Sequence, residues 1–307
     1  MTTGRSQFAI RPARHLAGSL RLPGDKSISH RYAMLAGIAS GKTQLRNFST
    51  GADCARTLAC MAALGCDVER GEESTGAAIA IAGCGPVLEA PRGALDCGNS
   101  GSTMRMLAGI LAAQPFTTRM FGDASLSRRP MARVIEPLER MGAAIRAAEG
   151  ALPPLEIRGA KTMLHGIEYA LPVASAQVKS ALLFAGLLAQ GDTWITEPHR
   201  TRDHGELALR AFGAEVTRER ERIGIRGGQA LHAVDVEIYV PGDISSAAFF
   251  LCAAAMLPGS RLVIDGLLLN PTRAAILDVL AGMGATLRVL DVEEQHGELM
   301  GSVQVTG

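Results

Sequence analysis

An internal repeat constrains the fold of this chain more than any other feature of its sequence. Glycine follows an apolar, helical segment and precedes a strand-like one at four positions, Gly65, Gly142, Gly213 and Gly284. By their residue numbers, successive glycines lie 77, 71 and 71 residues apart. Self-similarity at a fixed period indicates one structural unit used several times. The sequence therefore predicts four copies of a single supersecondary unit.

Each copy opens with a small, polar segment that leads into an apolar run, a strand, a second helix and two closing strands. The apolar runs cover residues 32–39, 104–113, 181–189 and 247–257. The strands expected after them cover residues 43–48, 117–121, 193–196 and 261–264. Residues 54–64 and 131–141 are typical second helices. The unit reads as β-α-β-α-β-β, which predicts an α/β (α+β) fold made of pseudo-symmetric repeats.

The starts of the four first helices are suited to anions. These starts are rich in small polar residues and cover residues 25–27, 98–103, 175–177 and 242–246. A helix start presents unpaired N–H groups and the positive end of the helix dipole. A solenoid would spread these starts along an open face, whereas a closed pseudo-symmetric domain would bring them to one point. The even spacing favours convergence on one shared ligand.

A domain boundary is expected near Pro241-Gly242, where a proline and a glycine break the chain. Residues 231–239, just before it, alternate in hydropathy and read as a strand. Three repeats precede this point and one follows it. We therefore expect a three-repeat, substrate-binding domain over residues 23–240. Residues 1–22 and 241–307 are expected to form a partial second domain with one repeat.

The composition excludes several classes of protein. A formal net charge of +1 provides no general polyanion-binding surface, and 4% aromatic residues are too few for base stacking. The six cysteines lack CxxC or Cys/His ligand spacing, so neither a zinc site nor a disulfide framework is expected. We find no secretory signal and no apolar run of bilayer length. We expect a soluble, cytoplasmic protein that binds neither nucleic acid nor membranes.

The segment 23–32 is the most informative of the helix starts. Asp25 or Ser27 can cap the helix, and Lys26 adds a cation at its first turn. Ser27 and Arg31 are four residues apart and so share one helix face. This group of side chains suits a phosphate or a carboxylate. A capped surface helix with solvated Lys and Arg explains the same residues equally well at this point.

Two further segments carry groups for an oxyanion. The glycines of the turn 98–103 permit close approach of a ligand to the backbone, although a serine-capped turn explains them too. Pro130 suits the first turn of the following helix. That position would put Arg129 at the helix mouth, where a guanidinium can fork onto a phosphate or carboxylate. Arg128 is expected to be solvated.

The third repeat adds neutral hydrogen-bonding groups. Ser175 and Gln177 can contact a hydroxyl or a phosphate oxygen, and Lys179 fits either a ligand contact or a structural ion pair. Three histidines lie near the motifs, namely His30, His199 and His204. The order of His, Asp and Ser residues does not match a hydrolase triad. We therefore interpret the histidines as structural.

Taken in order, the motifs resemble the EPSP synthase (3-phosphoshikimate 1-carboxyvinyltransferase) family. They are Pro-Gly-Asp-Lys-Ser-Ile-Ser-His-Arg from Pro23, Gly-Asn-Ser-Gly-Ser-Thr-Met-Arg from Gly98, Gly-Asp-Ala-Ser-Leu-Ser-Arg-Arg-Pro-Met from Gly122, Ala-Ser-Ala-Gln-Val-Lys-Ser-Ala from Ala174, Pro-Gly-Asp-Ile-Ser-Ser-Ala from Pro241 and Asn-Pro-Thr-Arg from Asn270. Each motif alone is weak, but the ordered set is specific and covers essentially the whole chain.

The resemblance implies the enolpyruvyl transferase fold, in which two domains of three units each close over the active site. It implies transfer of an enolpyruvyl group from phosphoenolpyruvate to the 5-hydroxyl of shikimate 3-phosphate, with release of phosphate. The implied partners are these two small molecules, and no metal or organic cofactor is implied.

The family's functional residues carry over position by position, with Lys26 as the catalytic residue that contacts both substrates. Those implied for shikimate 3-phosphate are Lys26, Ser27, Arg31, Ser175, Ala176, Gln177 and Arg202. Those implied for phosphoenolpyruvate are Lys26, Asn99, Gly101, Arg129 and Gln177.

The chain departs from the family pattern after its fourth repeat. The family continues for two repeats that carry an acidic proton acceptor, a Lys-Glu-Ser-Asp-Arg segment and an Asp-His-Arg segment, none of which occurs in this sequence. We therefore expect a C-terminally truncated, incomplete second domain with little turnover by this chain alone, unless a second chain supplies the missing repeats. A fragment that binds shikimate 3-phosphate without catalysis is the first alternative.

The second alternative is the related UDP-N-acetylglucosamine enolpyruvyl transferase. That enzyme would carry a Lys-Asn pair in the opening motif and a reactive cysteine in the loop before the arginine-proline pair. Here Ser27 follows Lys26, and the loop before Arg129 has no cysteine. The sequence therefore favours the EPSP synthase interpretation.

The motifs predict unequal roles for two neighbouring arginines. Replacing Lys26 or Arg129 with Ala should weaken binding of phosphoenolpyruvate or phosphate by about 1.5–3 kcal/mol, the value of a charge-assisted contact. Arg128→Ala should leave binding nearly unchanged. Calorimetric titration of the three variants checks this expectation, and equal losses at Arg128 and Arg129 would contradict it.

Overall fold

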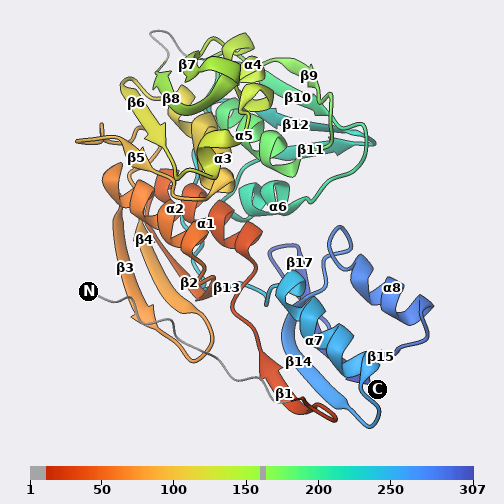
Figure 1. Cartoon of the computed structure of the whole chain (residues 1–307). Helices are drawn as coiled ribbons and strands as arrows, with labels where there is room; N and C mark the ends of the chain where they lie inside the picture. The colour runs from red at the N-terminus through yellow and green to blue at the C-terminus, as the bar shows by residue number, and fades with distance from the viewer. Residues whose placement is uncertain (1–11, 160–163) are drawn as a thin grey trace.

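The structure, a computed structural model, describes residues 12–159 and 164–307 and contains one small sheet for each of the four repeats (Figure 1). The first sheet has the order β13 (Ile238–Tyr239), β2 (Lys42–Phe48), β4 (Ala77–Ala82), β3 (Asp67–Glu72). The second has the order β5 (Leu95–Asp96), β6 (Thr117–Phe121), β8 (Leu152–Arg158), β7 (Ala144–Ala148). The third has the order β9 (Glu168–Ala170), β10 (Asp192–Thr196), β12 (Arg222–Arg226), β11 (Val216–Glu219).

The fourth sheet follows the same plan. Its order is β1 (Ala17–Arg21), β14 (Arg261–Leu268), β17 (Glu298–Thr306), β15 (Thr286–Val289), and β16 (Glu293–Gln295) also pairs with β17. In all four sheets the first pair is parallel and the next two pairs are antiparallel. The matching order and direction confirm the predicted repeated unit and the α/β (α+β) fold class.

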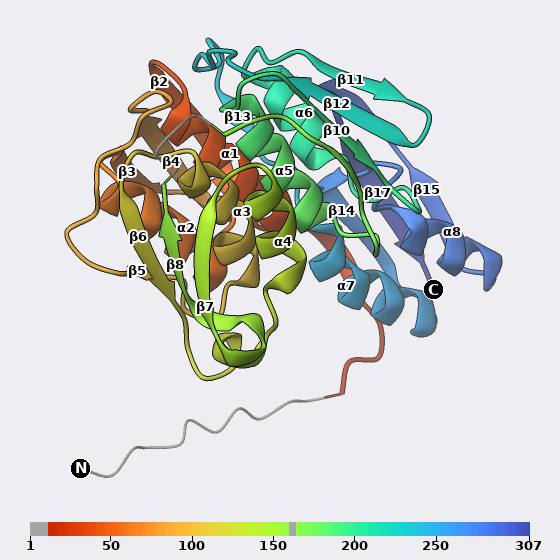
Figure 2. The ribbon, with the colours of Figure 1, turned by 90° about the horizontal axis from the view of Figure 1, so that it is seen from above.

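Two kinds of helix alternate along the chain. The first helices of the repeats are α1 (Lys26–Ile38), α3 (Gly101–Ala112), α5 (Ala176–Leu187) and α7 (Ile244–Met256). The second helices are α2 (Ala52–Ala63), α4 (Ala132–Arg140), α6 (His204–Ala211) and α8 (Ala275–Gly282), and two 3-10 turns cover Leu126–Arg128 and Glu149–Ala151. In Figure 2, α1, α3 and α5 lie in the centre with the first three sheets outside them. These three helices are buried on nearly all faces, as their uninterrupted apolar runs predict.

The four repeat glycines share one structural role. Gly65, Gly142, Gly213 and Gly284 follow the second helices with φ values of 96°, 104°, 91° and 94°. In each case the N–H of the glycine and that of the next residue donate back to the last turn of the helix, as Gly65 N does to Ala62 O at 3.1 Å. This Schellman ending needs a left-handed residue, which glycine adopts without strain. The spacing seen in the sequence therefore reports four equivalent helix ends.

Exchange of two edge strands joins the first and fourth repeats. The strand β13 leads into α7 but pairs with β2 of the first repeat, whereas β1 leads into α1 but pairs with β14 of the fourth repeat. We call residues 23–240 the three-sheet lobe, and residues 12–22 with 241–307 the single-sheet lobe. Residues 1–11 of the expected second domain lie outside the described residues, and independent folding of the two expected domains stays a prediction.

Two details of the sequence interpretation are wrong. Only Ile238 and Tyr239 of the expected strand 231–239 are in a strand. Upstream of them the backbone instead bonds to the end of the first repeat's helix, where Ser40 N donates to Leu231 O at 2.9 Å. Pro130 is not in the first turn of a helix, because α4 begins at Ala132. Its effect is on the residue before it, Arg129, which proline biases towards the extended conformation found there (φ −94°, ψ 119°).

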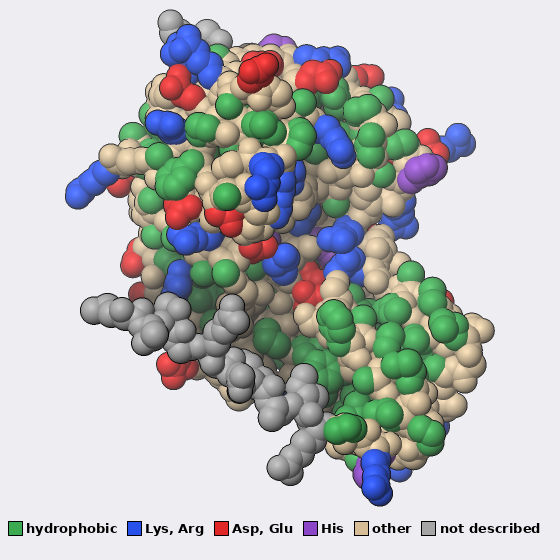
Figure 3. All heavy atoms as spheres, in the orientation of Figure 1, with side chains coloured by type: hydrophobic (Ala, Val, Ile, Leu, Met, Phe, Trp, Pro, Cys, Tyr) green, Lys and Arg blue, Asp and Glu red, His purple; other side chains and the backbone are tan. Residues whose placement is uncertain are grey.

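One face of the single-sheet lobe is apolar. Phe249 and Met256 of α7 are 80% and 74% exposed, and Met283 after α8 is 78% exposed. Figure 3 shows hydrophobic side chains gathered on this lobe. In the described residues the outer face of α7, which carries part of the apolar run 247–257, is open to solvent. No helix in the described part of the chain has the length and apolarity needed to cross a bilayer.

The two chain connections between the lobes lie side by side. Gly24 and Gly242 form an isolated antiparallel bridge. Asn47 holds both connections, since its side-chain Nδ2 donates to Leu22 O at 3.1 Å and to Val240 O at 3.0 Å. Its backbone is left-handed, with φ 51°, a conformation that asparagine tolerates better than most residues. Asn47 therefore fixes the crossing point of the lobes.

This geometry predicts a graded loss of stability at Asn47. Asn47→Gly keeps the left-handed backbone but removes three side-chain hydrogen bonds, the two to Leu22 O and Val240 O and one accepted from Thr75 Oγ1, which should lower the free energy of unfolding by about 1–3 kcal/mol. Asn47→Ala should lower it by roughly 1–2 kcal/mol more, because a Cβ is strained in this region. Urea unfolding of the three proteins measures the order, and a Gly variant as stable as the unmodified protein would contradict it.

Candidate functional site

A cavity of about 350 Å³ opens where the two lobes meet, and the starts of all four first helices reach it. Its lining residues are Lys26, Ser27 and Arg31 from α1, Ser102 from α3, Ala176 and Gln177 from α5, Arg202, then Asp243, Ser245 and Arg273 from the single-sheet lobe. Blue Lys and Arg side chains face the hollow between the lobes in Figure 3. The expected convergence of helix starts is therefore confirmed.

The start of α1 presents two cations of different character. Asp25 caps the helix by accepting from Ile28 N at 3.0 Å, so it is the cap that the sequence left open. Lys26 is half exposed and pairs with Asp53 at 2.9 Å. Arg31 is buried, and its three nitrogens donate only to neutral oxygens, which are Ser180 Oγ at 3.0 Å, Ser27 O at 2.8 Å and Ala176 O at 3.1 Å. Arg31 therefore ties α1 to α5 and keeps its positive charge uncompensated by a carboxylate.

Gln177 joins the starts of α5 and α3. Its Nε2 donates to Ser102 Oγ at 2.8 Å, and its Oε1 accepts from Arg105 Nη1 at 3.0 Å. Ser175 caps α5 by accepting from Val178 N at 3.3 Å and does not line the cavity. The amide of Gln177 is thus held between the cavity and a second group of cations.

That second group surrounds the glycine turn. Arg129 Nη2 donates to Asn99 Oδ1 at 2.6 Å and to Ser125 Oγ at 3.1 Å, and Asn99 in turn donates to Asp123 at 2.8 Å. A Cβ placed on Gly101 would lie 2.6 Å from Arg105 Nη1 and 3.5 Å from Arg129 Nη1. The turn, Arg105 and Arg129 therefore form a compact cationic group beside the cavity rather than in its lining.

The opposite wall combines both lobes. Arg202 Nη1 donates to Ser27 Oγ at 3.2 Å. Arg273 Nη2 donates to Ser245 Oγ at 2.6 Å and lies 3.6 Å from Asp25 Oδ2 and 4.0 Å from Asp243 Oδ1. These are long ion pairs, and the Nε of Arg273 is buried without a hydrogen-bond partner in the described residues. Arg273 thus lines the cavity with a guanidinium that no carboxylate of the described residues holds at short range.

Positive charge is left unbalanced around this site. Within the described part of the chain, Arg31, Arg105, Arg129 and Arg202 have no carboxylate within 4.0 Å. Burial lowers the pKa of Arg31 to about 10. Burial, followed by repulsion from Arg129, lowers the pKa of Arg105, and burial with repulsion from Arg273 lowers that of Arg202. Fixed guanidinium groups without a nearby carboxylate favour negative charge, so the site is poised to bind anions.

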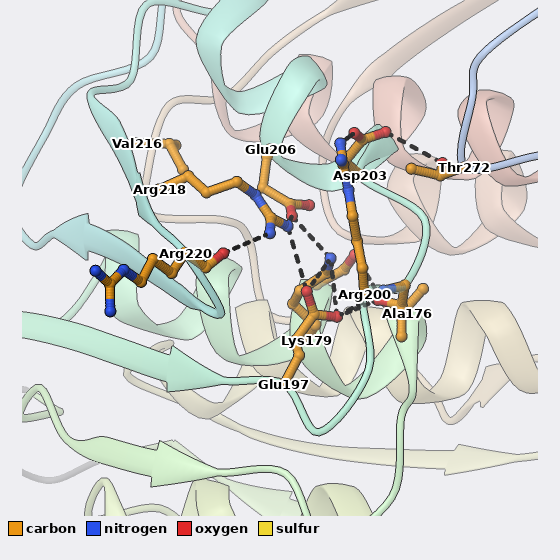
Figure 4. A network of polar contacts seen from close by, with 12 residues as sticks. Ala176, Lys179, Glu197, Arg200, Asp203, Glu206, Val216, Arg218, Arg220 and Thr272 are labelled. Carbon is orange, nitrogen blue, oxygen red and sulfur yellow. Dashed lines mark hydrogen bonds and ion pairs between the residues drawn. The ribbon is translucent and has the colours of Figure 1, made fainter.

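Lys179 serves the scaffold rather than the cavity. Its buried ammonium lies 2.7 Å from Glu206 and 3.2 Å from Glu197. Arg218 closes the network, with contacts of 3.3 Å to Glu197 and 3.2 Å to Glu206 (Figure 4). Glu197 also accepts from the backbone N–H and the hydroxyl of Thr201. Of the two roles left open for Lys179, the structure supports the ion pair, which anchors the loop before Arg202.

A buried hydrogen-bonded chain links three helices behind the site. His30 Nδ1 lies 2.7 Å from Thr57 Oγ1 of α2, which lies 2.7 Å from Thr103 Oγ1 of α3. Thr103 Oγ1 contacts the cap of α3, Ser100 Oγ, at 2.7 Å. His204 is likewise buried and paired, with its Nδ1 2.6 Å from Glu298. His30 and His204 are therefore structural, as expected.

The structure sorts the residues that the sequence singled out. Those in the cavity lining are Lys26, Ser27, Arg31, Ala176, Gln177 and Arg202; those in the adjacent cationic group are Asn99, Gly101 and Arg129. Sequence reasoning missed the roles of Ser102, Arg105, Asp243, Ser245 and Arg273. Their signal was present, because all five lie in motifs or helix starts that had been noted, but spacing alone did not show which side chains face the cavity.

Comparisons with known proteins agree on one family. A family model described as EPSP synthase (3-phosphoshikimate 1-carboxyvinyltransferase) matches residues 10–305. A 3-phosphoshikimate 1-carboxyvinyltransferase of Koribacter versatilis is 57% identical over 294 residues, which are 96% of this chain and 67% of that protein. Its counterpart in Bacillus velezensis is 49% identical over 292 residues, which are 94% and 66% of the two chains.

A solved structure of an EPSP synthase from Acinetobacter baumannii is similar to this chain with a TM-score of 0.88. Its sequence is 44% identical, and the match covers 95% of this chain and 65% of that one. The chain therefore spans about two thirds of the length of these relatives.

The buried His30 predicts a specific pH dependence of stability. Burial, with repulsion from Arg31, lowers its pKa from 6.5 to about 3. Between pH 6.5 and pH 3 the His30 side chain binds a proton in the unfolded chain but not in the folded protein. The free energy of unfolding therefore falls as the pH drops towards 3. In His30→Gln this contribution disappears, and the slope should differ from that of the unmodified protein by up to about 1.4 kcal/mol per pH unit. Urea unfolding from pH 8 to pH 4.5 measures both slopes, and parallel curves would contradict the assignment.

Proposed function

This chain belongs to the EPSP synthase family, and on that premise we propose that it acts in enolpyruvyl transfer from phosphoenolpyruvate to the 5-hydroxyl of shikimate 3-phosphate. The observation that carries the proposal is a pair of cationic groups bridged by Gln177, in which Arg31, Arg202, Arg105 and Arg129 have no carboxylate within 4.0 Å among the described residues. Two anionic substrates must be brought into contact despite their mutual repulsion. Fixed guanidinium groups and helix dipoles reduce that repulsion and orient both reactants.

We assign the cavity to shikimate 3-phosphate. Its proposed contacts in the lining are Lys26, Ser27, Arg31, Ala176, Gln177 and Arg202. Ser175, which caps α5 next to Ala176, is proposed as a further contact from outside the lining of the empty cavity. Arg202 supplies a guanidinium for the phosphate, and its neighbour Ser27 supplies a hydroxyl. Arg31 acts from behind, because its nitrogens already donate to protein oxygens and its charge reaches the cavity through space. We further propose that residues 23–240 form the substrate-binding domain.

Phosphoenolpyruvate is assigned to the adjacent cationic group. Its proposed contacts are Lys26, Asn99, Gly101, Arg129 and Gln177. Arg129 is held by Asn99 and Ser125, which fixes the direction of its guanidinium before a ligand arrives. The absence of a side chain on Gly101 leaves the backbone open to a small carboxylate or phosphate. Lys26, at the edge of the cavity, is the proposed catalytic contact to both substrates.

The reaction needs little covalent chemistry from these residues. Protonation of the methylene carbon of phosphoenolpyruvate makes the adjacent carbon electrophilic, and the substrate hydroxyl oxygen adds to it as its proton leaves. Loss of a proton from the new methyl group then expels phosphate and restores the double bond. In the proposal, Lys26 stabilises charge on the bridging oxygen, and the arginines hold both anions in place.

The proposed partners are therefore the two small-molecule substrates. The comparisons give no support for a second chain as a partner, and the cytoplasmic location expected from the sequence stays a prediction. The family match over residues 10–305 favours this reaction over that of the UDP-N-acetylglucosamine enzyme. Binding of shikimate 3-phosphate without turnover is retained as an outcome that experiment can distinguish.

Calorimetry with shikimate 3-phosphate, followed by a phosphate-release assay with both substrates, tests the proposal. We expect binding that shikimate without its phosphate does not reproduce, and phosphate release only when both substrates are present. Arg202→Ala should weaken shikimate 3-phosphate by about 1.5–3 kcal/mol, while Arg128→Ala, at an exposed position, serves as the matched arginine control. Equal binding of shikimate and shikimate 3-phosphate would overturn the assignment, and binding without phosphate release would leave only the binding function.

A further inference from the structure

A polar cluster beside the cavity joins the two lobes at the loop that carries Arg202. Asp203 and His204 contribute from the three-sheet lobe, and Asn270, Thr272 and Glu298 from the single-sheet lobe. We call these five residues the inter-lobe clasp. None of them lines the cavity.

Asn270 is the centre of the clasp. Its Nδ2 donates to Asp203 Oδ1 and to Glu298 Oε2, both at 2.9 Å. Its Oδ1 accepts from Thr272 N at 2.8 Å and from Thr272 Oγ1 at 2.7 Å. The side chain is buried, and its amide uses all four of its hydrogen-bonding positions. One neutral amide thus separates and satisfies two carboxylates that would otherwise repel each other.

The two carboxyl groups of the clasp have fixed partners. Burial alone would raise the pKa of Asp203, but hydrogen bonds from Asn270 and Arg200 outweigh it and hold that pKa below its usual value. Glu298 is buried between Asn270 and His204 Nδ1, which lies 2.6 Å from Glu298 Oε1. Buried polar groups of this kind are costly to leave unpaired, so the clasp resists separation of the lobes at this point.

The clasp adjoins two arginines of the cavity. Arg202 directly precedes Asp203, and Arg273 directly follows Thr272, whose hydroxyl oxygen lies 3.3 Å from Asp203 Oδ1. The backbone N–H of Arg273 also donates to Asn270 O at 2.8 Å. Both guanidinium groups line the cavity, one from each lobe. Like charges repel, so an arrangement that keeps these arginines together needs an attachment between the lobes, and the clasp provides it.

We propose that the inter-lobe clasp is a positioning device which holds Arg202 and Arg273 together as a two-guanidinium receptor for one phosphate group. Asn270 then controls phosphate affinity although it does not touch the ligand. This rests on the proposed function in one respect, that the phosphate is the one carried by shikimate 3-phosphate. Arg273, which lines the cavity and has only long ion pairs, becomes a phosphate-binding residue in addition to those assigned above.

The other side of the Arg202 loop is held independently. Thr201 donates to Glu197, which belongs to the buried ion network with Lys179 and Arg218. Figure 4 shows Thr272 next to Asp203, and Glu197 next to Lys179. Loss of the clasp should therefore loosen one end of the loop without unfolding it. Phosphate affinity should then fall but not vanish, because the Arg202 guanidinium is displaced from the cavity rather than removed.

A double-mutant cycle with Asn270→Ala and Arg202→Ala tests positioning against general damage. The probes are inorganic phosphate and shikimate 3-phosphate, both titrated calorimetrically. Asn270→Ala should weaken both probes about tenfold, which corresponds to about 1.4 kcal/mol. In the Arg202→Ala background the same change should cost less than about twofold, because its action passes through the missing guanidinium. A purely structural role would give the same loss in both backgrounds.

Gln295→Ala provides a matched control. Gln295 is also an amide of the single-sheet lobe that reaches across to the other lobe, since it accepts from Tyr239 N at 2.8 Å and donates to Glu237 O at 3.2 Å. It lies outside the cavity lining. Its removal should change phosphate affinity by less than about twofold. A loss equal to that of Asn270→Ala would show that any weakened lobe contact has the same effect, and would overturn the proposal.

The remaining outcomes are also decisive. The positioning role of the clasp is overturned if Asn270→Ala leaves phosphate affinity unchanged. It is also overturned if Asn270→Ala causes equal losses in the unmodified protein and in the Arg202→Ala variant. If Asn270→Ala does not unfold cooperatively, Thr272→Val replaces it, and we expect a loss of roughly threefold that vanishes with Arg202→Ala; unchanged affinity there overturns the proposal as well. Binding of inorganic phosphate without binding of shikimate 3-phosphate would refute the proposed function. In that case the double-mutant cycle measured with inorganic phosphate still tests the positioning role of the clasp. Binding of neither probe refutes both.

Discussion

Uncompensated positive charge at the meeting point of four helix starts is the constraint on which the rest of this structure depends. Placing a guanidinium in the interior costs several kcal/mol unless its donors are satisfied. Arg31 meets that requirement with a serine hydroxyl and two backbone carbonyls, which satisfy its hydrogens without cancelling its charge. A carboxylate in the same place would stabilise the empty protein better, but it would compete with an anionic ligand. The choice of neutral acceptors therefore favours binding over stability.

Lys179 shows the opposite arrangement on the same helix pair. It is as buried as Arg31, yet two glutamates and an arginine surround it, and its charge is cancelled within the scaffold. The two cations belong to similar small-polar motifs and look alike in sequence. What separates a ligand-facing cation from a structural one is the placement of Glu197 and Glu206, which come from later elements of the chain. Local sequence does not contain that information, and both roles for Lys179 were therefore open until the structure was known.

The features predicted correctly from sequence are those set by local backbone rules. Gly65 and its three counterparts end helices, and Asp25, one of the two caps that the sequence allowed, caps α1, because these roles depend on the conformations that single residues adopt. The convergence of helix starts followed from the evenness of the repeat. The errors and omissions depend on long-range contacts. Residues before Ile238 bond to the end of α1 instead of extending a strand, and the side chain of Asn270 finds partners that lie 67 residues before it and 28 after it.

Strand exchange and the clasp together explain how one cavity is built from two lobes. Exchange of β1 and β13 brings both chain connections through one point, where Asn47 bonds to Leu22 and Val240. A single crossing point leaves relative rotation of the lobes open, so a second attachment is needed to define their arrangement. Asn270 supplies it by bonding to Asp203. If phosphate binds best when Arg202 and Arg273 are together, linkage requires that phosphate in turn stabilise the clasped arrangement by the same factor. The change in phosphate affinity and the change in the population of the clasped arrangement then report the same coupling free energy.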